Sequence, residues 1–385
     1  MNACFSSSTE CWPIEGTIIT NVAGNGEQGL KDGPVIDAHF NAPTGIVHDS
    51  KVNHTYVLDL YSNSIRLIDH EGKPEPTVST FAHLKSKTTL PWNFILIPEA
   101  CRTSDRHLVF GTMSGIYSVS SDGQTITLFA GHDKLWGFLD GPIESARFHD
   151  VTAMAIDSQN RLLICDRNNH RIRSISLAID QPSQVITIAG SGELGHQHIT
   201  HQNPFMATFH SPRGICVDDK DTIVIIDDFN HMISRIDAHS GAVTTFAGAN
   251  GGWGQSDGLG GQASFYIPLC ILFDQQTRNF FISDVSSIRV INSKGLVTTI
   301  VGSTYFDEDG KIVKFHYPSG MALESVTQPL HYNNWINDRP EFQYWPPGLL
   351  DIVMDYLPQI VSLLITDGSN HRIKRVCAEL PWSHH

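Results

Sequence analysis

Three histidines within six residues form the densest group of potential metal ligands in the chain. They are His196, His198 and His201, in the segment His-Gln-His-Ile-Thr-His. Imidazole nitrogens are common ligands of zinc and related ions, so this segment could hold Zn²⁺ or Ni²⁺. The spacing is more typical of a solvated loop. We therefore treat the three as weak metal candidates and expect the protein to need no cofactor.

A second set of potential ligands occupies one recurring position, the residue that follows a phenylalanine. A ring of imidazoles at one level would suggest a metal site, which would also need supporting partners around it. Two repeats carry a different residue there, so the position favours a polar group rather than a ligand. The five residues are His149, His210, His316, Asn41 and Tyr266.

An aspartate followed by an Asn-His pair recurs after apolar runs, at residues 166–170, 227–231 and 367–371. A catalytic group is needed once, whereas a structural turn is needed in every repeat. A short carboxylate can accept backbone N–H groups in a tight turn, and Asn tolerates left-handed geometry there. We interpret these segments as turns.

One arginine stands at the head of an apolar run where the other repeats are uncharged. Arg213 lies between a proline and a glycine and could bind an anion. It could equally form an ion pair between neighbouring repeats, a common role of arginine. The corresponding residues elsewhere are Thr44, Thr152, Leu269 and Ser319.

Four cations occupy matching places in Ile-x-x-Ile runs. A nucleic-acid reader would expose such cations on one face with aromatic residues between them. Inside a sheet, their stems pack and their charges pair with carboxylates. The acidic balance of the chain favours the structural reading. The residues are Arg66, Arg173, Arg289 and Lys374.

Two tryptophans lie in glycine-rich segments that read as long surface loops. Trp136 lies in residues 134–138 and Trp253 in residues 251–258. The glycines form no phosphate-binding fingerprint, because no helix follows them. An exposed Trp is a good anchor for a partner, although Trp as often packs beneath its own loop. Both remain candidates for partner binding.

The elements that must position these side chains form a repeat. A glycine that ends a strand-like run recurs at Gly24, Gly131, Gly190, Gly248 and Gly302, about 55 residues apart or twice that. Each repeat holds four short apolar runs separated by turn residues. Four antiparallel strands per repeat are typical of a propeller blade. We count six blades, the second of them without the Asp and Asn-His turn.

The phase of the repeat predicts how the ring closes. The chain starts with an outer-type strand at residues 17–22 and ends with a third-type strand at residues 373–376. We therefore expect the N-terminal strand to complete the last blade.

Blade six departs from the repeat through an insertion at about residues 324–359. Apolar residues recur at helical spacing in its second half, with proline near both ends. This pattern predicts a helix that either docks on its own propeller or binds a partner. The candidate residues are Trp335, Leu349, Ile352, Val353 and Tyr356.

The composition limits the class of protein. Twenty-six basic and 40 acidic residues give a formal charge of −14 over 385 residues. This balance disfavours nucleic acid and anionic membranes as partners. Seven scattered cysteines suggest no disulfide framework, and no run is long and apolar enough for a membrane helix. We expect a soluble, intracellular, cytoplasmic monomer.

The recurring elements resemble the NHL repeat, named for Asn-His-Leu. The resemblance lies in Pro-Arg-Gly-Ile at residues 212–215, the Asp to Asn-His turns at 166–170, 227–231 and 367–371, and the runs that follow them. It implies an all-β, six-bladed propeller of four-stranded antiparallel blades. The same fold carries lyases, lactonases, RNA readers and protein docks, so it implies no single activity.

The resemblance also bears on metal chemistry at the channel mouth. Amidating lyases of similar fold place zinc-binding His where this chain has Thr44, Arg213 and Ser319. Calcium-dependent lactonases need several oxygen ligands that converge there. The rim offers neither. We therefore expect a protein-interaction scaffold that binds through upper-face loops or the blade-six insertion.

Two alternatives and the domain limits complete the expectation. One alternative is a metal-dependent hydrolase or lyase with its site at the channel mouth, and the second is RNA binding. We expect an N-terminal extension at residues 1–16, the propeller at 17–376 and a tail at 377–385.

Overall fold

The computed structural model describes most of the chain with atomic detail. The described residues are 17–70, 75–84, 94–97, 107–178, 183–195, 203–248, 252–302, 305–306, 312–313, 315, 317–324 and 359–380. The predicted helix in the blade-six insertion, with Trp335, Leu349, Ile352, Val353 and Tyr356, lies outside them, as does the segment with His196, His198 and His201.

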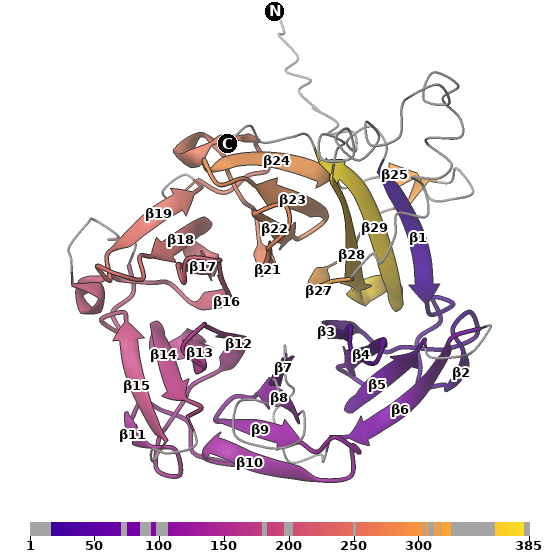
Figure 1. Cartoon of the computed structure of the whole chain (residues 1–385), viewed down its shortest axis with the longest axis horizontal. Coiled ribbons are helices and arrows are strands. Elements are labelled where there is room, and N and C mark those ends of the chain that lie inside the picture. The colour runs from indigo at the N-terminus through magenta and orange to yellow at the C-terminus, as the bar shows by residue number, and fades with distance from the viewer. Residues whose placement is uncertain are drawn as a thin grey trace, which may run out of the picture.

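Six antiparallel sheets stand around a central axis, as expected for a six-bladed propeller (Figure 1). The strands of the first three blades, from the axis outward, are β3 (Pro43–Asp49), β4 (His54–Asp59), β5 (Ser64–Asp69) and β6 (Thr77–His83); β7 (Phe94–Ile97), β8 (His107–Gly111), β9 (Gly115–Val119) and β10 (Ile126–Gly131); and β12 (Val151–Ile156), β13 (Arg161–Asp166), β14 (Arg171–Ser176) and β15 (Gln184–Ala189).

The other three blades repeat this order. Their strands are β16 (Pro212–Val217), β17 (Ile223–Asp227), β18 (Met232–Ile236) and β19 (Val243–Ala247); β21 (Pro268–Asp274), β22 (Asn279–Asp284), β23 (Ser287–Ile291) and β24 (Leu296–Val301); and β27 (Pro318–Leu323), β28 (Gln359–Asp367), β29 (Arg372–Leu380) and β1 (Ile18–Ala23). A separate two-stranded sheet joins β25 (Tyr305–Phe306) and β26 (Ile312–Val313).

The N-terminal strand lies in the sheet of the last blade. β1 runs antiparallel to β29, with Ile18 opposite Cys377 and Ala23 opposite Ile373. The outermost strand of blade six therefore comes from the opposite end of the chain from its three companions (Figure 1).

Three blades have a fifth strand that the repeat pattern did not predict. The inter-blade linker, which leads from the outer strand of one blade to the inner strand of the next, contributes two residues that pair with the outer strand. These pieces are β2 (Gly33–Pro34) on β6, β11 (Gly141–Pro142) on β15 and β20 (Gly258–Leu259) on β24. Each begins at the Gly of an Asp-Gly pair, and these glycines have φ of 137°, 127° and 151°, values that favour glycine.

The core lies between the blades rather than in a single centre. Leu163 and Cys165 of β13, for example, pack against Ile215 of β16 and Ile225 of β17 in one buried cluster. Strands covered on both faces explain why these runs are apolar throughout instead of alternating. Burial raises the pKa of the Cys270 thiol to about 11.

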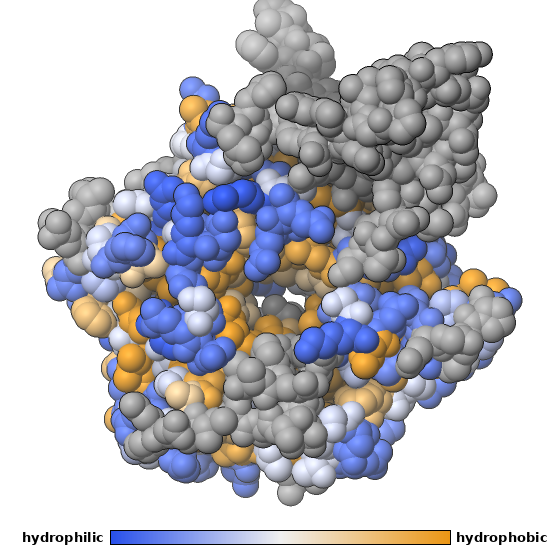
Figure 2. All heavy atoms as spheres, viewed as in Figure 1, coloured by the Kyte–Doolittle hydropathy of each residue, from blue (hydrophilic) through white to orange (hydrophobic). Residues whose placement is uncertain are grey.

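The inner strands approach one another closely at the axis. A Cβ on Gly320 of β27 would clash with the carbonyl oxygen of Thr44 in β3, so the contact of blades six and one requires glycine at this position. Figure 2 shows an opening at the centre of the ring, with hydrophobic residues along parts of its wall. Among the described residues, no helix is long and apolar enough to cross a membrane.

Candidate functional site

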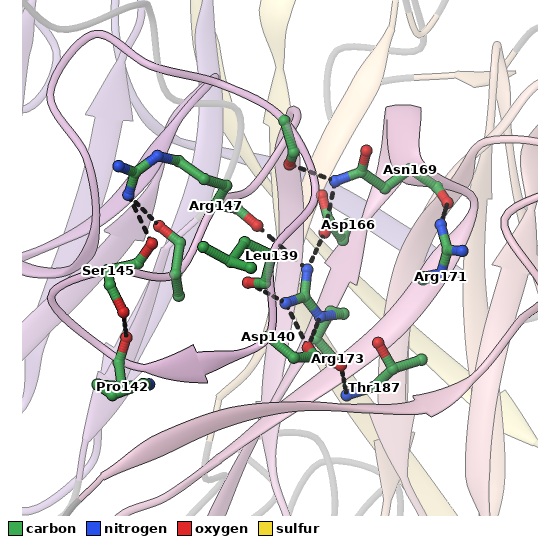
Figure 3. Close-up of polar contacts among 12 residues, drawn as sticks. Leu139, Asp140, Pro142, Ser145, Arg147, Asp166, Asn169, Arg171, Arg173 and Thr187 are labelled. Carbon is green, nitrogen blue, oxygen red and sulfur yellow. Dashed lines mark hydrogen bonds and ion pairs between the residues drawn. The ribbon is translucent and has the colours of Figure 1, made fainter.

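The arginines of the third strands are structural, and Figure 3 shows the blade-three example. Arg173 of β14 is fully buried and donates to Asp166 at 2.6 Å and to Asp140 at 2.5 Å. The guanidinium also donates to the carbonyl oxygens of Leu139 and Arg147, at 2.9 and 3.2 Å. The side chain thus connects the inter-blade linker to β13, the strand that precedes the Asn-His turn, by hydrogen bonds.

The aspartate of each Asp-Gly pair also connects the linker to the outer strand of the blade. The second carboxylate oxygen of Asp140 accepts the backbone N–H of Thr187 in the outer strand β15 (Figure 3). Blades one and five repeat the arrangement, since Arg66 donates to Asp32 at 2.7 Å and Arg289 to Asp257 at 2.8 Å. The sequence indicated pairing of these cations with carboxylates, and the structure identifies the partners.

The aspartate at the end of each second strand organises the turn above it. Asp166 accepts the backbone N–H of His149 and the side-chain amide of Asn169, both at 2.8 Å, besides Arg173. Burial raises the pKa of Asp166 to about 6, while the charge of Arg173 and these hydrogen bonds act in the opposite direction. The carboxylate is fully buried and its hydrogen bonds go to the frame of the blade.

The histidine of each Asn-His turn connects two blades. His170 follows the 3-10 turn η1 (Arg167–Asn169) in the left-handed conformation, with φ of 54°. Its Nδ1 accepts the backbone N–H of Ser211, which leads into blade four, at 3.2 Å. His371 accepts the N–H of Ala42 in the same way across the seam of blades six and one. Each of these histidines therefore forms a hydrogen bond between two neighbouring blades.

The inter-blade hydrogen bond of His170 predicts that the free energy of unfolding depends on pH. Burial lowers the pKa of His170, and the neighbouring His210 lowers it further. The unfolded chain therefore takes up this proton at higher pH than the native state. The stabilisation is present above the ordinary His pKa of about 6.5 and is lost as pH falls through the lower native pKa.

The matched variant is His170→Asn, because Asn tolerates the left-handed conformation and keeps an acceptor near the Nδ1 position without titrating. Between pH 7.5 and 5.5, the wild type should lose about 1 kcal/mol more of its unfolding free energy than the variant, as judged from the value of one hydrogen bond. Urea denaturation at several pH values measures this difference. Parallel pH profiles for the two proteins would show that protonation of His170 does not change the stability of the fold.

Side chains that vary from blade to blade gather on the upper face, defined here as the face where the second strands end. In the linkers that lead into blades one, three and five, one residue contacts the residue after the recurring phenylalanine. In blade one this pair is polar, because Gln28 donates to Asn41 at 2.9 Å. In blade three, Trp136 stacks on His149 with ring centroids 4.3 Å apart. In blade five, the rings of Trp253 and Tyr266 lie 5.4 Å apart.

The two tryptophans are therefore exposed and not packed beneath their loops. Trp136 is 61% exposed and Trp253 is 68% exposed, each resting on the blade through one ring contact. Blade four adds Phe229 of the turn η3 (Asp228–Asn230), which is 53% exposed and lies 5.0 Å from the ring of His210. We call Trp136, Phe229, Trp253 and Tyr266 the upper-face aromatic set.

Arg213 forms part of a chain of alternating charges at the channel mouth. It donates to Asp228 at 3.3 Å, Asp228 lies 3.7 Å from Arg167, and Arg167 donates to Asp150 at 3.1 Å. The first contact is within blade four, and the second joins blades three and four. The sequence singled out Arg213 but missed Arg167, Asp228 and Phe229. The available signal was that each of them breaks the repeat at its own position.

The remaining rim positions are uncharged. Thr44, Thr152 and Leu269 are almost completely buried, and the hydroxyl of Ser319 donates to the carbonyl oxygen of Thr44. In the part of the chain that the structure describes, no three His, Cys, Asp or Glu side chains converge as a metal site would require.

Comparison with known sequences identifies related proteins. A family model of the NHL repeat matches residues 148–173, which include β12, β13 and the Asn-His turn of blade three. The human NHL repeat-containing protein 2 is 24% identical over 320 residues, which cover 78% of this chain and 38% of that protein. The Arabidopsis thaliana protein SUPPRESSOR OF QUENCHING 1, chloroplastic, is 22% identical over 290 residues, 70% of this chain and 26% of that protein. The chain thus spans well under half the length of these relatives.

Comparison with solved structures supports the fold. An auxiliary nutrient binding protein from Bacteroides thetaiotaomicron superposes with a TM-score of 0.63 and 17% identity, over 94% of this chain and 77% of that one. A likeness at this level of identity establishes the propeller architecture alone.

Proposed function

We propose that this chain, a six-bladed β-propeller whose third blade matches the NHL repeat, acts over residues 17–376 as a scaffold that binds a protein partner through the upper-face aromatic set. The carrying observation is that Trp136 and Trp253 are exposed at equivalent positions where blade one has a polar pair. A position that the fold leaves free to vary, and that holds Trp twice, is suited to recognition.

An exposed indole ring is unfavourable in water, so a partner that covers it gains free energy. Burying apolar surface against a partner stabilises the complex by about 25 cal/mol per Å². Trp and Tyr residues contribute much of the binding free energy of protein interfaces. The ring contacts with His149 and Tyr266 hold the two indoles in place, so little side-chain entropy is lost on binding. The fixed blades beneath supply a rigid platform in the same way.

The test is recovery of partners by the tagged protein and by the double variant Trp136→Ala with Trp253→Ala. A protein that co-purifies with the wild type and binds it again as a pure component should bind the double variant at least about tenfold more weakly, since two anchors are removed. The matched control is Phe205→Ala. Phe205 is also exposed but lies in the turn η2 (Pro204–Met206), whose Pro204 packs near Gly241 in the β18–β19 turn.

Two results would contradict the scaffold. One is unchanged affinity of the double variant for the isolated partner. The other is stoichiometric zinc or calcium in the purified wild type together with a turnover that the double variant retains, which would favour the metal-dependent hydrolase or lyase. Tight, salt-sensitive binding of RNA would favour the remaining alternative.

A further inference from the structure

The row of alternating charges Asp150–Arg167–Asp228–Arg213 lies at the seam of blades three and four and is not part of the repeat. The residue that follows the second-strand aspartate is Arg167 in blade three and Asp228 in blade four. The same place holds Leu60, Val285 or Gly368 in blades one, five and six. The fold therefore does not require charge at this position.

The other two members of the row are equally irregular. Asp150 precedes the inner strand at a place where blades one, four, five and six have Ala42, Ser211, Ile267 and Tyr317. Arg213 is the one charged residue among the five rim positions compared above. Interactions that recur in several blades, such as those of Arg173, maintain the fold. Among the described residues, such a row of four charges occurs on one side of the channel mouth only, and a local task explains it better than the fold does.

The two signs of charge are not equally accessible. The side chains of Arg167 and Arg213 are 23% and 25% exposed, whereas those of Asp150 and Asp228 are 6% and 5% exposed. The carboxylates thus hold the two guanidinium groups, and the arginine side chains are the more exposed members of the row. Within the described residues, Asp228 is the one hydrogen-bond partner of Arg213, at 3.3 Å, although a guanidinium has five donors.

An apolar surface borders these donors. The guanidinium carbon of Arg167 lies 5.6 Å from the ring centroid of Phe229, and this exposed ring contacts His210. The seam between blades three and four therefore offers two guanidinium groups, each held by a buried carboxylate, next to an aromatic face. Guanidinium groups recognise carboxylates by paired N–H bonds, and an aromatic face accepts an apolar side chain.

We infer that this seam binds a peptide segment of the protein partner in which a carboxylate, received by Arg213 and Arg167, stands beside an apolar side chain placed on Phe229. This inference rests on the proposed function and names the chemistry of the partner. A polyanion such as RNA fits less well, because the whole chain carries a charge of −14. A single carboxylate needs no more than the two guanidinium groups at this seam.

The experiment uses the full chain and a phage-displayed library of random octapeptides. Peptides selected on the wild type should be enriched in Asp or Glu next to Phe, Leu or Trp. Each is then synthesised with a fluorescent label, together with an analogue in which the acidic residue is replaced by its amide. Arg213→Ala should weaken binding of the acidic peptide at least about tenfold and leave the amide analogue nearly unchanged.

A second variant keeps the test decisive if the first is poorly folded. Asp228→Asn removes the carboxylate that competes with the ligand for both guanidinium groups, so it should tighten binding of the acidic peptide severalfold, a gain that misfolding cannot produce. The control is Arg235→Ala, which removes an exposed guanidinium from β18 of the same blade, where it covers Phe246.

Several outcomes would overturn the inference: no enrichment of acidic residues, no selected peptide at all, equal binding to Arg213→Ala, or preferential binding of a labelled decamer of uridine. Failure of the inference can be told from failure of the scaffold. A partner that is lost from the double tryptophan variant but retained by Arg213→Ala leaves the scaffold intact and removes the carboxylate contact. A partner retained by both removes the two proposals together.

Discussion

Replacing Arg173 with alanine is expected to lower the free energy of unfolding by about 3–5 kcal/mol, the range for breaking a buried ion pair by removal of one partner. The guanidinium is fully buried and is shared between Asp166, which is also fully buried, and Asp140. Its loss leaves the Asp166 carboxylate inside the blade without its counter-ion. It also releases the linker, because two linker carbonyl groups lose their donor (Figure 3).

Urea denaturation followed by tryptophan fluorescence measures this change, and Arg147→Ala is the matched control. Arg147 lies in the same linker and is partly exposed, and its side chain donates only to the carbonyl groups of its neighbours Ser145 and Ala146. The control should change stability by less than about 0.5 kcal/mol, as is usual away from buried networks. A change below 1 kcal/mol in Arg173→Ala would show that the network adds little.

The deficit of Arg173→Ala should itself depend on pH. Burial already raises the pKa of Asp166 to about 6 in the wild type, and removal of the facing guanidinium must raise it further. An acid with a raised native pKa destabilises the fold above that pKa and ceases to do so as it becomes protonated. The difference between variant and wild type is therefore expected to shrink as pH falls from 8 to 5. A constant difference would locate the effect in packing rather than charge.

The sequence was sufficient for the blade count and for the structural reading of the Asn-His turns, because both depend on recurrence. It did not predict the fifth strands or the role of the Asp-Gly pairs. Asp140 and Arg173 are separated by 33 positions, and periodicity reveals that each recurs but not that they touch. A signal did exist: blades one, three and five have both the arginine and the Asp-Gly pair, whereas blade four has Ser234 in place of the arginine.

The candidate site was harder to predict for a related physical reason. Arg213 was visible as a lone charge at the head of an inner strand. Its partner Asp228, and Arg167 beyond it, lie in turns whose other residues recur, so the sequence pattern gives them the same structural role as those turns. Only the folded ring brings the two turns together, because the contact joins neighbouring blades. In a repeat protein the informative residues are those that differ within a conserved frame, and comparison of the blades position by position reveals them.

Deletion of residues 1–24 is expected to destabilise the entire ring and not blade six alone. β1 supplies the outer strand of blade six and pairs with β29 from Ile18 opposite Cys377 to Ala23 opposite Ile373. Ile19 is buried in the cluster that joins blades five and six, which also contains Val376. Without β1, β29 becomes an open edge along one side, and such an edge promotes aggregation.

Thermal unfolding and size-exclusion chromatography measure the outcome. The deletion should lower the melting temperature by at least about 5 °C and shift much of the protein to aggregates, given that even about 2 kcal/mol moves the transition of a domain this large by several degrees. The single variant Ile19→Ala should cost about 2–4 kcal/mol through the cavity it leaves. Thr20→Ala, in the same strand but half-buried, is the matched control and should cost much less.

Rescue separates loss of a strand from loss of chain length. A synthetic peptide of residues 17–24 added to the deletion variant should restore the melting temperature toward that of the wild type, because the pairing with β29 needs no covalent link to the first blade. The Gly24 turn supports the same argument, since a Cβ there would lie 2.6 Å from the carbonyl oxygen of His371 and the strand must end in glycine to fit. A deletion variant that stays monomeric with an unchanged melting temperature would mean that five blades and an incomplete sixth hold the ring closed without the N-terminal strand.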